Sequence, residues 1–321
     1  MTRTHYFLLA LGLLPYVLGH PDTPYHKESK RATIPDLGFY SPLADGGSML
    51  TQIPETYPAG QGEPLNVIIS GKSDPLILSS SPQDNGGLFN YFLSLSFGTS
   101  CGGGINLGDK QSANLGDGQG YVNETIVMRY NYGDPVRGTC TETQLGGNHF
   151  RFWRQSGSTA NSSAVFLAYD VSNELSLEQQ HDIAINGYNL GRDWLVGNAT
   201  NNAFANPNPL ATQASTTASG PAIIPSASYT GSTTANGWTY QTTATYVAGL
   251  LEAVSEGINH NSTVEEDGRP AVDGLVALLT VSITARNETT STSGSEISRR
   301  LAGGHLSVIA LSSAFAALLA L

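Results

Sequence analysis

The sequence predicts an α/β fold, with α+β as the open alternative, in which helices pack on a mixed sheet. Two short apolar runs with β-branched residues, "LNVIISG" at 65–71 and "AVFLAYDV" at 164–171, are typical of buried strands. The segments after them, "DNGGLFNYFLSLSFG" at 84–98 and "NGYNLGRDWLVGNA" at 186–199, space apolar residues at helical intervals. Strands that alternate with helices favour a sheet covered by helices.

The first elements follow a lead-in over 32–64 that is rich in Gly, Pro and Ser and predicts extended chain. A strand over 65–71 comes next and ends at a glycine. The helix after it can be capped by Asp84 or Asn85 and stops at Gly98. Its apolar face consists of Leu88, Tyr91, Phe92 and Leu95.

The stretch "GGNHFRFWRQSG" at 146–157 predicts a strand that pairs antiparallel with 164–171. Side chains alternate along a strand, so Phe150 and Phe152 share the core face. His149, Arg151 and Trp153 then lie on the other face. The sequence "HDIAI" at 181–185 predicts a short strand before a helix capped at Asn186, with Tyr188, Leu195 and Trp194 facing inward.

The remaining chain divides by composition. We expect the domain core over 65–200 and a disordered Ser/Thr/Pro/Asn-rich insertion carrying O-linked sugar over 201–245. Over 246–284 the sequence predicts a helix in "TYVAGLLEAVSEGI" and a last strand in "DGLVALLTVSI".

The first residues carry one cation and then a short apolar run, which predicts a secretory signal peptide over 1–19 cleaved after Gly19. A pro-segment over 20–31 would end at the dibasic pair that closes with Arg31. A flexible amino terminus, or a retained spanning helix in place of the signal, are the alternatives.

The carboxy-terminal end predicts a glycosylphosphatidylinositol (GPI) anchor. A Ser/Thr stalk and polar spacer over 285–304 surround a cluster of small residues that places the lipid on Ser293, and an apolar tail over 305–321 would be removed. A tail-anchored protein is the alternative.

Both ends indicate an oxidising, extracellular compartment. Cys101 and Cys140 are then most simply a disulfide, and a reactive thiol or a metal ligand is the minor alternative. Asn-x-Ser/Thr acceptors for N-linked sugar stand at Asn123, Asn161, Asn198, Asn261 and Asn287.

The chain is acidic, with a formal net charge of −11. Such a surface repels phosphate backbones and anionic lipids, so we expect no nucleic-acid partner and no electrostatic membrane binding. Membrane attachment would depend on the lipid. The sequence shows no spacing of metal ligands, and we expect neither a metal nor a cofactor.

The order of "EPLNVIISG", "GGNHFRFWR", "AVFLAYDV" and "HDIAINGYNLGRDWLV" resembles the LssY carboxy-terminal domain, which occurs in bacterial and in fungal secreted proteins. The resemblance covers roughly 65–198 and implies an α/β domain, but it supplies no reaction. The residues that carry it are Gly71, His149, Arg151, Trp153, 165–169, His181, Arg192 and Asp193. The chain departs from the family pattern in lacking a proline after His181 and in the long loops after Cys101.

The candidate site residues are His149, His181, Arg151 and Arg192. If they converge, imidazoles and guanidinium groups would form a pocket for an anion. The alternative is that the two arginines form structural ion pairs with Asp170 and Asp193.

Two further motifs carry little weight. "GTSCG" matches a nucleophile elbow at Ser100, but a helix precedes it where a strand is required. "SGKSD" at 70–74 resembles the end of a phosphate loop, but the first glycine of that motif is missing.

The sequence therefore predicts a GPI-anchored, glycosylated surface or cell-wall protein of a fungus, with a role in recognition of a wall polysaccharide or small anionic ligand. The alternative is an extracellular hydrolase of an anionic ester that uses the His and Arg residues.

Overall fold

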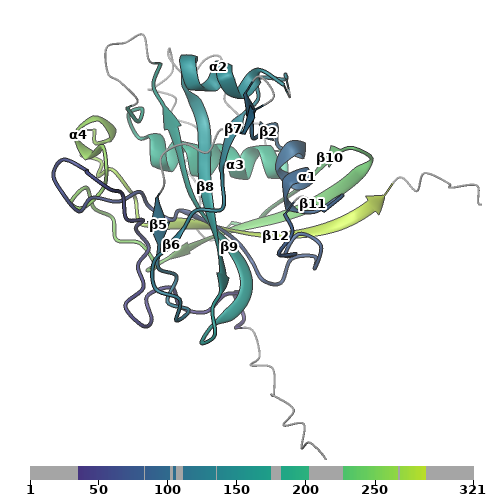
Figure 1. The fold of residues 1–321 in the computed structure, drawn as a ribbon, viewed down its shortest axis with the longest axis horizontal. Helices are drawn as coiled ribbons and strands as arrows, with labels where there is room; N and C mark the ends of the chain where they lie inside the picture. The colour runs from purple at the N-terminus through teal and green to yellow at the C-terminus, as the bar shows by residue number, and fades with distance from the viewer. Residues whose placement is uncertain are drawn as a thin grey trace, which may run out of the picture.

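A mixed eight-stranded sheet forms the centre of the molecule (Figure 1). The computed structural model describes residues 35–82, 84–101, 104–105, 111–134, 136–174, 182–201, 227–266 and 268–286. The strand order is β10-β11-β12-β1-β9-β8-β7-β2, in which β1 and β12 are parallel and the other pairs antiparallel. The strands are β1 Val67–Ile69, β2 Phe97–Gly98, β7 Val127–Tyr130, β8 Gly147–Ser156, β9 Asn161–Ser172, β10 Tyr229–Ala235, β11 Trp238–Ala248 and β12 Leu275–Arg286.

Short elements complete the structure. Strand β3 (Ser100–Cys101) pairs with β4 (Gly104–Ile105), and β5 (Ser112–Ala113) pairs with β6 (Val122–Asn123). The helices are α1 Leu88–Ser94, α2 Gly138–Leu145, α3 Gly187–Thr200 and α4 Asn261–Val264. The fold class predicted from the sequence, helices on a mixed sheet, is confirmed.

Helices α1 and α3 cover one face of the sheet. Phe92 of α1 packs on Phe150 of β8 with ring centroids 4.7 Å apart, and Leu195 and Val196 of α3 belong to the same buried cluster. Phe152 shares this face with Phe150, as the alternation along β8 predicted.

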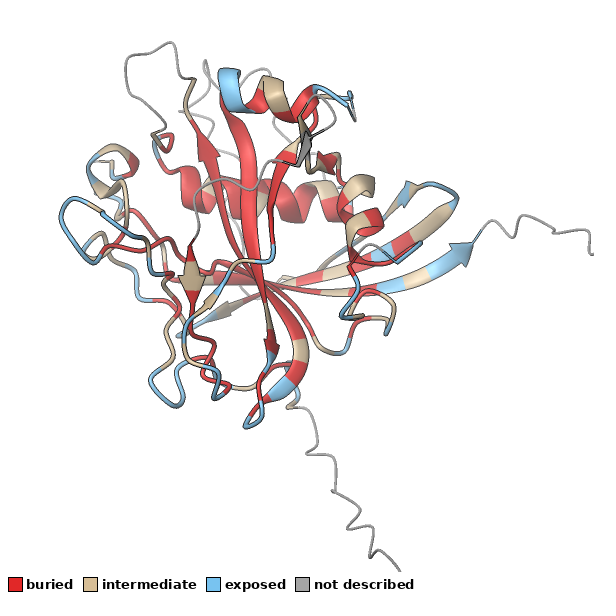
Figure 2. Ribbon diagram, viewed as in Figure 1, coloured by how far each residue is buried: buried red, intermediate tan, exposed pale blue. Residues whose placement is uncertain are grey.

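Loops cover the opposite face, and Figure 2 shows buried residues along most of β8 and β9. Phe39 and Met49 of the lead-in pack there against Trp153 and Phe166. His149 and Arg151 point to this second face as expected, but they are buried rather than solvent-facing. The predicted extended lead-in therefore contributes a second apolar core.

The sequence predicts the positions of α1 and α3 correctly, but it predicts the wrong capping interactions. The residue before α1 is Gly87, without a side-chain cap, and α1 ends at Ser94, before Gly98 enters β2. Asn186 does precede α3, in the left-handed region at φ 58°, but it caps no helix N–H with its side chain. Tyr188, Trp194 and Leu195 are buried, as predicted.

The carboxy-terminal third of the domain differs most from expectation. Part of the predicted disordered insertion forms the β10–β11 hairpin, whose turn residues Asn236 and Gly237 have φ values of 49° and 79°. Positive φ at both turn residues is the geometry that Asn-Gly favours between antiparallel strands. The predicted helix after residue 245 is absent, because β11 continues to Ala248 and 249–258 forms bends, a turn and an isolated bridge at Ile258. The predicted last strand is confirmed as β12.

Cys101 and Cys140 form a disulfide with a sequence separation of 39, as predicted. It ties β3 to α2, and closing a loop of that length stabilises a fold by roughly 3 to 4 kcal/mol in the chain-entropy model.

Several predicted features lie outside the described residues: the signal and pro-segments with Gly19 and Arg31, Asn287, and the anchor site Ser293 with its tail. Among the acceptor asparagines that the structure describes, Asn123 and Asn161 are exposed, and Asn198 and Asn261 are partly exposed. No helix of the described ranges is both long and apolar enough to span a bilayer.

Candidate functional site: a polar pocket on the loop side of the sheet

A polar pocket of about 370 Å³ opens between the lead-in, the middle of β8 and the segment around α4. This volume suits a small ligand. Its lining combines carboxylates, amides and hydroxyls with one guanidinium and one imidazole. The residues are Ile53, Pro54, Glu55, Thr56, Tyr57, Gln61, Glu63, Gln111, Arg151, Asp182, Asn259, His260, Asn261 and Ser262.

A buried hydrogen-bond network forms the inner end of the pocket. Arg151 Nη1 lies 3.4 Å from Glu63 Oε2, and Gln111 Nε2 donates to Glu63 Oε1 at 2.8 Å. Thr51 Oγ1 donates to Gln111 Oε1 at 2.8 Å and accepts from the Glu63 backbone N–H. Because each side chain is held by another, this end of the pocket is pre-organised.

An imidazole–carboxylate pair lies on the wall of the pocket. His260 Nδ1 is 2.8 Å from Asp182 Oδ1, which also accepts a 2.7 Å hydrogen bond from Thr263 Oγ1. His260 precedes α4 in the left-handed region at φ 56°, and its side chain is 26% exposed. A carboxylate on Nδ1 orients the ring.

The charges in the pocket disfavour an anion. Glu55, Glu63 and Asp182 face a single guanidinium, that of Arg151, which Glu63 already pairs. The surplus carboxylates would repel phosphate or carboxylate groups. Hydroxyl groups of a neutral ligand can instead donate to the carboxylates and accept from the amides.

Three acidic or basic side chains and one imidazole lie deeper, on neighbouring strands of the same face and on α2. Arg129 of β7 is opposite His149 of β8, which is opposite Asp170 of β9. His149 Nδ1 lies 3.2 Å from Asp170 Oδ1 and 3.4 Å from Glu142 Oε1. Arg129 Nη1 donates to Glu142 Oε2 at 2.6 Å. All four residues are buried.

Burial shifts the pKa values of this cluster. It lowers the pKa of His149 to about 4, against the opposing effect of Glu142. It raises the pKa of Asp170 well above the usual range, and Glu63 acts in the same direction. Burial also acts to raise the pKa of Glu142, but His149 and Arg129 hold it below its ordinary value. Since His149 is neutral above about pH 4, Arg129 is the cation that keeps Glu142 ionised near neutral pH. We infer that His149 and Asp170 together hold one proton.

This shared proton predicts a pH-dependent effect of Asp170→Asn. The folded variant holds no proton at this position, so folding of the parent takes up one proton more than folding of the variant. From about pH 4 up to the raised pKa of Asp170, the stability of the parent relative to the variant should fall by about 1.4 kcal/mol per pH unit. Urea unfolding of both chains at several pH values between about 4.5 and 8 measures how the difference in unfolding free energy depends on pH. A difference that does not change with pH would show that the pair holds no proton.

The sign follows from proton counts. Between the ordinary His pKa of 6.5 and the raised pKa of Asp170, the unfolded parent carries no proton on either residue, whereas the folded pair keeps one, so the parent loses stability as pH rises. Below 6.5 the unfolded His149 is protonated in both chains. The folded parent also holds one proton, on the His149–Asp170 pair, whereas the folded variant holds none. The variant therefore loses stability as pH falls.

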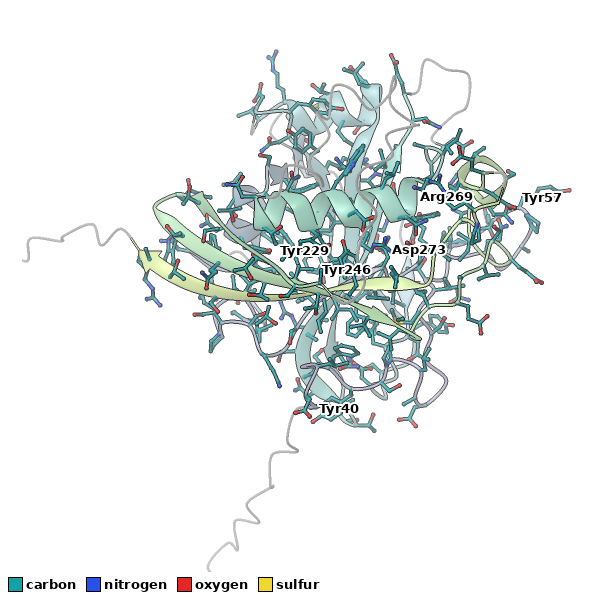
Figure 3. The ribbon with its side chains drawn as sticks, turned by 180° about the vertical axis from the view of Figure 1, so that it is seen from behind. Tyr40, Tyr57, Tyr229, Tyr246, Arg269 and Asp273 are labelled. Carbon is teal, nitrogen blue, oxygen red and sulfur yellow. A yellow bond between two sulfur atoms is a disulfide. The ribbon has the colours of Figure 1, made fainter. Side chains whose placement is uncertain are left out.

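Arg192 belongs to a different cluster, at the junction of α3, β11 and β12. Its Nε and Nη2 donate to Asp193, and its Nη1 and Nη2 donate to Asp273 at 2.6 and 2.9 Å. Nη1 also donates to the Leu275 carbonyl at 2.8 Å, and the guanidinium lies 5.3 Å from the ring centroid of Tyr246. In Figure 3, Tyr246 and Asp273 lie close to α3.

The structure therefore separates the candidates. Among those it describes, Arg151 alone lines the polar pocket; His149 lies in the buried cluster and Arg192 in the α3 junction. His181 lies outside the described residues. The alternative of structural ion pairs fits Arg192 with Asp193, whereas Arg151 pairs with Glu63 instead of Asp170.

Sequence reasoning did not select Glu63, Asp182 or His260. Asp182 and Thr263 contact each other across a sequence separation of 81, and Arg151 and Glu63 across 88. No local motif joins such positions. Within the described ranges, no group of three or more His, Cys, Asp or Glu side chains is arranged to hold a metal ion.

The chain matches no family model, no curated protein and no solved structure. The resemblance to the LssY domain stays a prediction, and the functional assignment depends on the residues of the pocket.

Proposed function

We propose that this chain is a GPI-anchored, glycosylated protein of a fungal cell surface or wall, whose single LssY-like domain recognises a small, neutral, polyhydroxylated ligand. The observation that carries the proposal is the composition of the polar pocket, in which carboxylates and amides outnumber the one guanidinium. The signal peptide, the acceptor asparagines and the anchor pattern of the sequence support the location.

A binding role fits the geometry of the pocket. The Arg151–Glu63–Gln111 network is already hydrogen-bonded and buried, so it presents polar groups in fixed positions to a ligand rather than an uncompensated charge. Tyr57 lies at the pocket and is 99% exposed, and Figure 3 shows it at the periphery of the molecule. An aromatic ring at such a rim can stack on the apolar face of a sugar.

Tyr57→Ala tests the pocket. Because the side chain is almost fully exposed, folding should be unchanged, while affinity for a neutral saccharide should fall by about 2- to 10-fold, which corresponds to roughly 0.5 to 1.5 kcal/mol for an aromatic contact. Thermal unfolding of the full chain with a panel of neutral and anionic mono- and disaccharides measures this, since a ligand stabilises the folded chain by an amount that grows with the logarithm of its concentration over its dissociation constant.

Tyr121→Ala is the matched control, because Tyr121 is 51% exposed and does not line the pocket. Stabilisation by anions only, or equal loss in both variants, would contradict a neutral-ligand pocket.

The anchor predicts release by enzyme. A phospholipase specific for inositol phospholipids should free the protein from intact cells, because the lipid and not a spanning helix would hold it. Replacing Ser293, Gly294 and Ser295 by bulky residues should abolish that release. Retention after treatment, together with peptides from 306–321 in the mature chain, would show a spanning tail instead.

The His260–Asp182 pair favours a second candidate, an extracellular hydrolase in which His260 is the general base. An imidazole oriented by a carboxylate in an accessible pocket is the arrangement that base catalysis uses. Turnover of a saccharide or ester by the parent that disappears in His260→Gln, with binding retained, would support this candidate over recognition.

A further inference from the structure

Two rows of neutral polar side chains, five hydroxyls and one amide, cross the outer face of β10, β11 and β12. The strand register aligns Thr230 with Thr243 and Thr243 with Thr280. A second row aligns Ser232, Gln241 and Ser282. Neighbouring strands lie about 4.8 Å apart and alternate residues about 6.8 Å apart, so these side chains form a regular two-dimensional array.

The other face of the same strands is the one that the helices cover. Thr233 Oγ1 is 2.7 Å from Ser94 Oγ, and Thr242 Oγ1 is 3.0 Å from the Tyr91 hydroxyl, both partners belonging to α1. Alternation therefore directs the two rows away from α1. Figure 2 shows exposed and intermediate residues along these strands, where β8 and β9 are buried.

The array is uncharged. Asp, Glu, Lys and Arg make up 13% of the chain, yet in these three strands only the terminal Arg286 is charged. Strand β10 is also an end strand of the sheet, and its seven residues include neither a charge nor a proline. Proteins usually protect such an edge with charges or proline, so an edge strand without either indicates a surface kept for contact.

The position in the chain points to the partner. Strand β12 ends at Arg286, and the residues that follow are the stalk and the predicted anchor. If the anchor forms, which is part of the proposed function, the array lies at the end of the domain nearest to the wall and membrane.

We propose that the outer face of β10–β12 is a second binding surface, which docks on the flat face of a neutral, β-linked wall polysaccharide. Neither this protein surface nor the polysaccharide carries a charge, so no ion loses its hydration when they bind. Each hydroxyl both donates and accepts, as the hydroxyls of a polysaccharide do. Threonine is stiff about χ1, so ordering these side chains costs little entropy. Single contacts are weak, and the repeat provides avidity.

The test is retention of the full-length chain, purified in detergent, on particles of chitin, β-1,3-glucan and cellulose. The parent should bind at least one of them and remain unbound to an anionic polysaccharide. The triple variant Thr230→Val, Thr243→Val, Thr280→Val keeps shape and strand propensity while removing one row of hydroxyls, and its affinity for the particles should fall 10-fold or more.

Two controls separate this surface from the pocket. Thr159→Val, at an exposed threonine outside these strands, should leave retention unchanged. Tyr57→Ala reports on the pocket: retention lost in Tyr57→Ala and kept in the triple variant would assign the binding to the pocket, so failure of the pocket proposal and failure of this one give different patterns. Far-ultraviolet circular dichroism establishes that the triple variant is folded.

Four outcomes overturn the proposal: no retention on any neutral particle, retention lost in Tyr57→Ala but kept in the folded triple variant, equal loss in the Thr159→Val control, or hexose attached to these hydroxyls in the secreted protein. Dimerisation through β10 without polysaccharide binding would likewise show that the neutral edge serves self-association.

Discussion

Arg129→Met should destabilise the fold by about 3 to 5 kcal/mol, because it leaves the Glu142 carboxylate buried without its cation. Arg129 and Glu142 are both buried, with side-chain exposures of 8% and 0%. Their 2.6 Å contact holds α2 against β7, and Arg129 is also opposite His149 in the sheet. Equilibrium unfolding in urea at neutral pH gives the difference.

A double variant separates the lost pair from the orphaned charge. Arg129→Met with Glu142→Gln removes both charges, so it should recover most of the stability that the single variant loses. The exposed pair Arg269–Glu266 is the control, since Arg269→Ala should change stability by only about 0 to 1 kcal/mol. A single variant that costs no more than this control would show that Glu142 simply takes up a proton or reaches water.

How far the sequence predicts this molecule depends on the range of the interactions. Alternation along β8 placed Phe150 and Phe152 on the helix side, because a strand repeats every two residues and the pattern is local. The Asn236-Gly237 turn, flanked by alternating Thr and aromatic residues, is also a local hairpin signal, but it lies in a Ser/Thr-rich segment whose composition predicts disorder.

The sites depend on long-range contacts. Glu63 meets Arg151 only because the lead-in folds over the second face of the sheet, and the sequence of the lead-in shows no periodicity from which that packing follows. The same covering buries His149 and removes it from solvent. The face of β8 that carries His149 and Arg151 therefore lies in the charged interior of the domain, and of these two residues Arg151 reaches the pocket.

Arg192→Ala should cost about 3 kcal/mol, at the lower end of the range for a broken buried pair. All five N–H groups of Arg192 are hydrogen-bonded, to Asp193, Asp273 and the Leu275 carbonyl. The arginine is 1% exposed, whereas the two carboxylates are 20% and 34% exposed, so water can relieve part of the charge left behind. Thermal and urea unfolding measure the loss.

Arg192→Lys distinguishes geometry from charge. A lysine keeps the positive charge but cannot form two forked pairs at once, so it should recover less than half of the loss. Tyr246 donates to Asp193 at 2.9 Å and lies against the guanidinium, so Tyr246→Phe should weaken the same junction by a further, smaller amount. Full recovery in Arg192→Lys would show that the site requires only a cation, and that the forked contacts between α3 and the start of β12 add nothing to it.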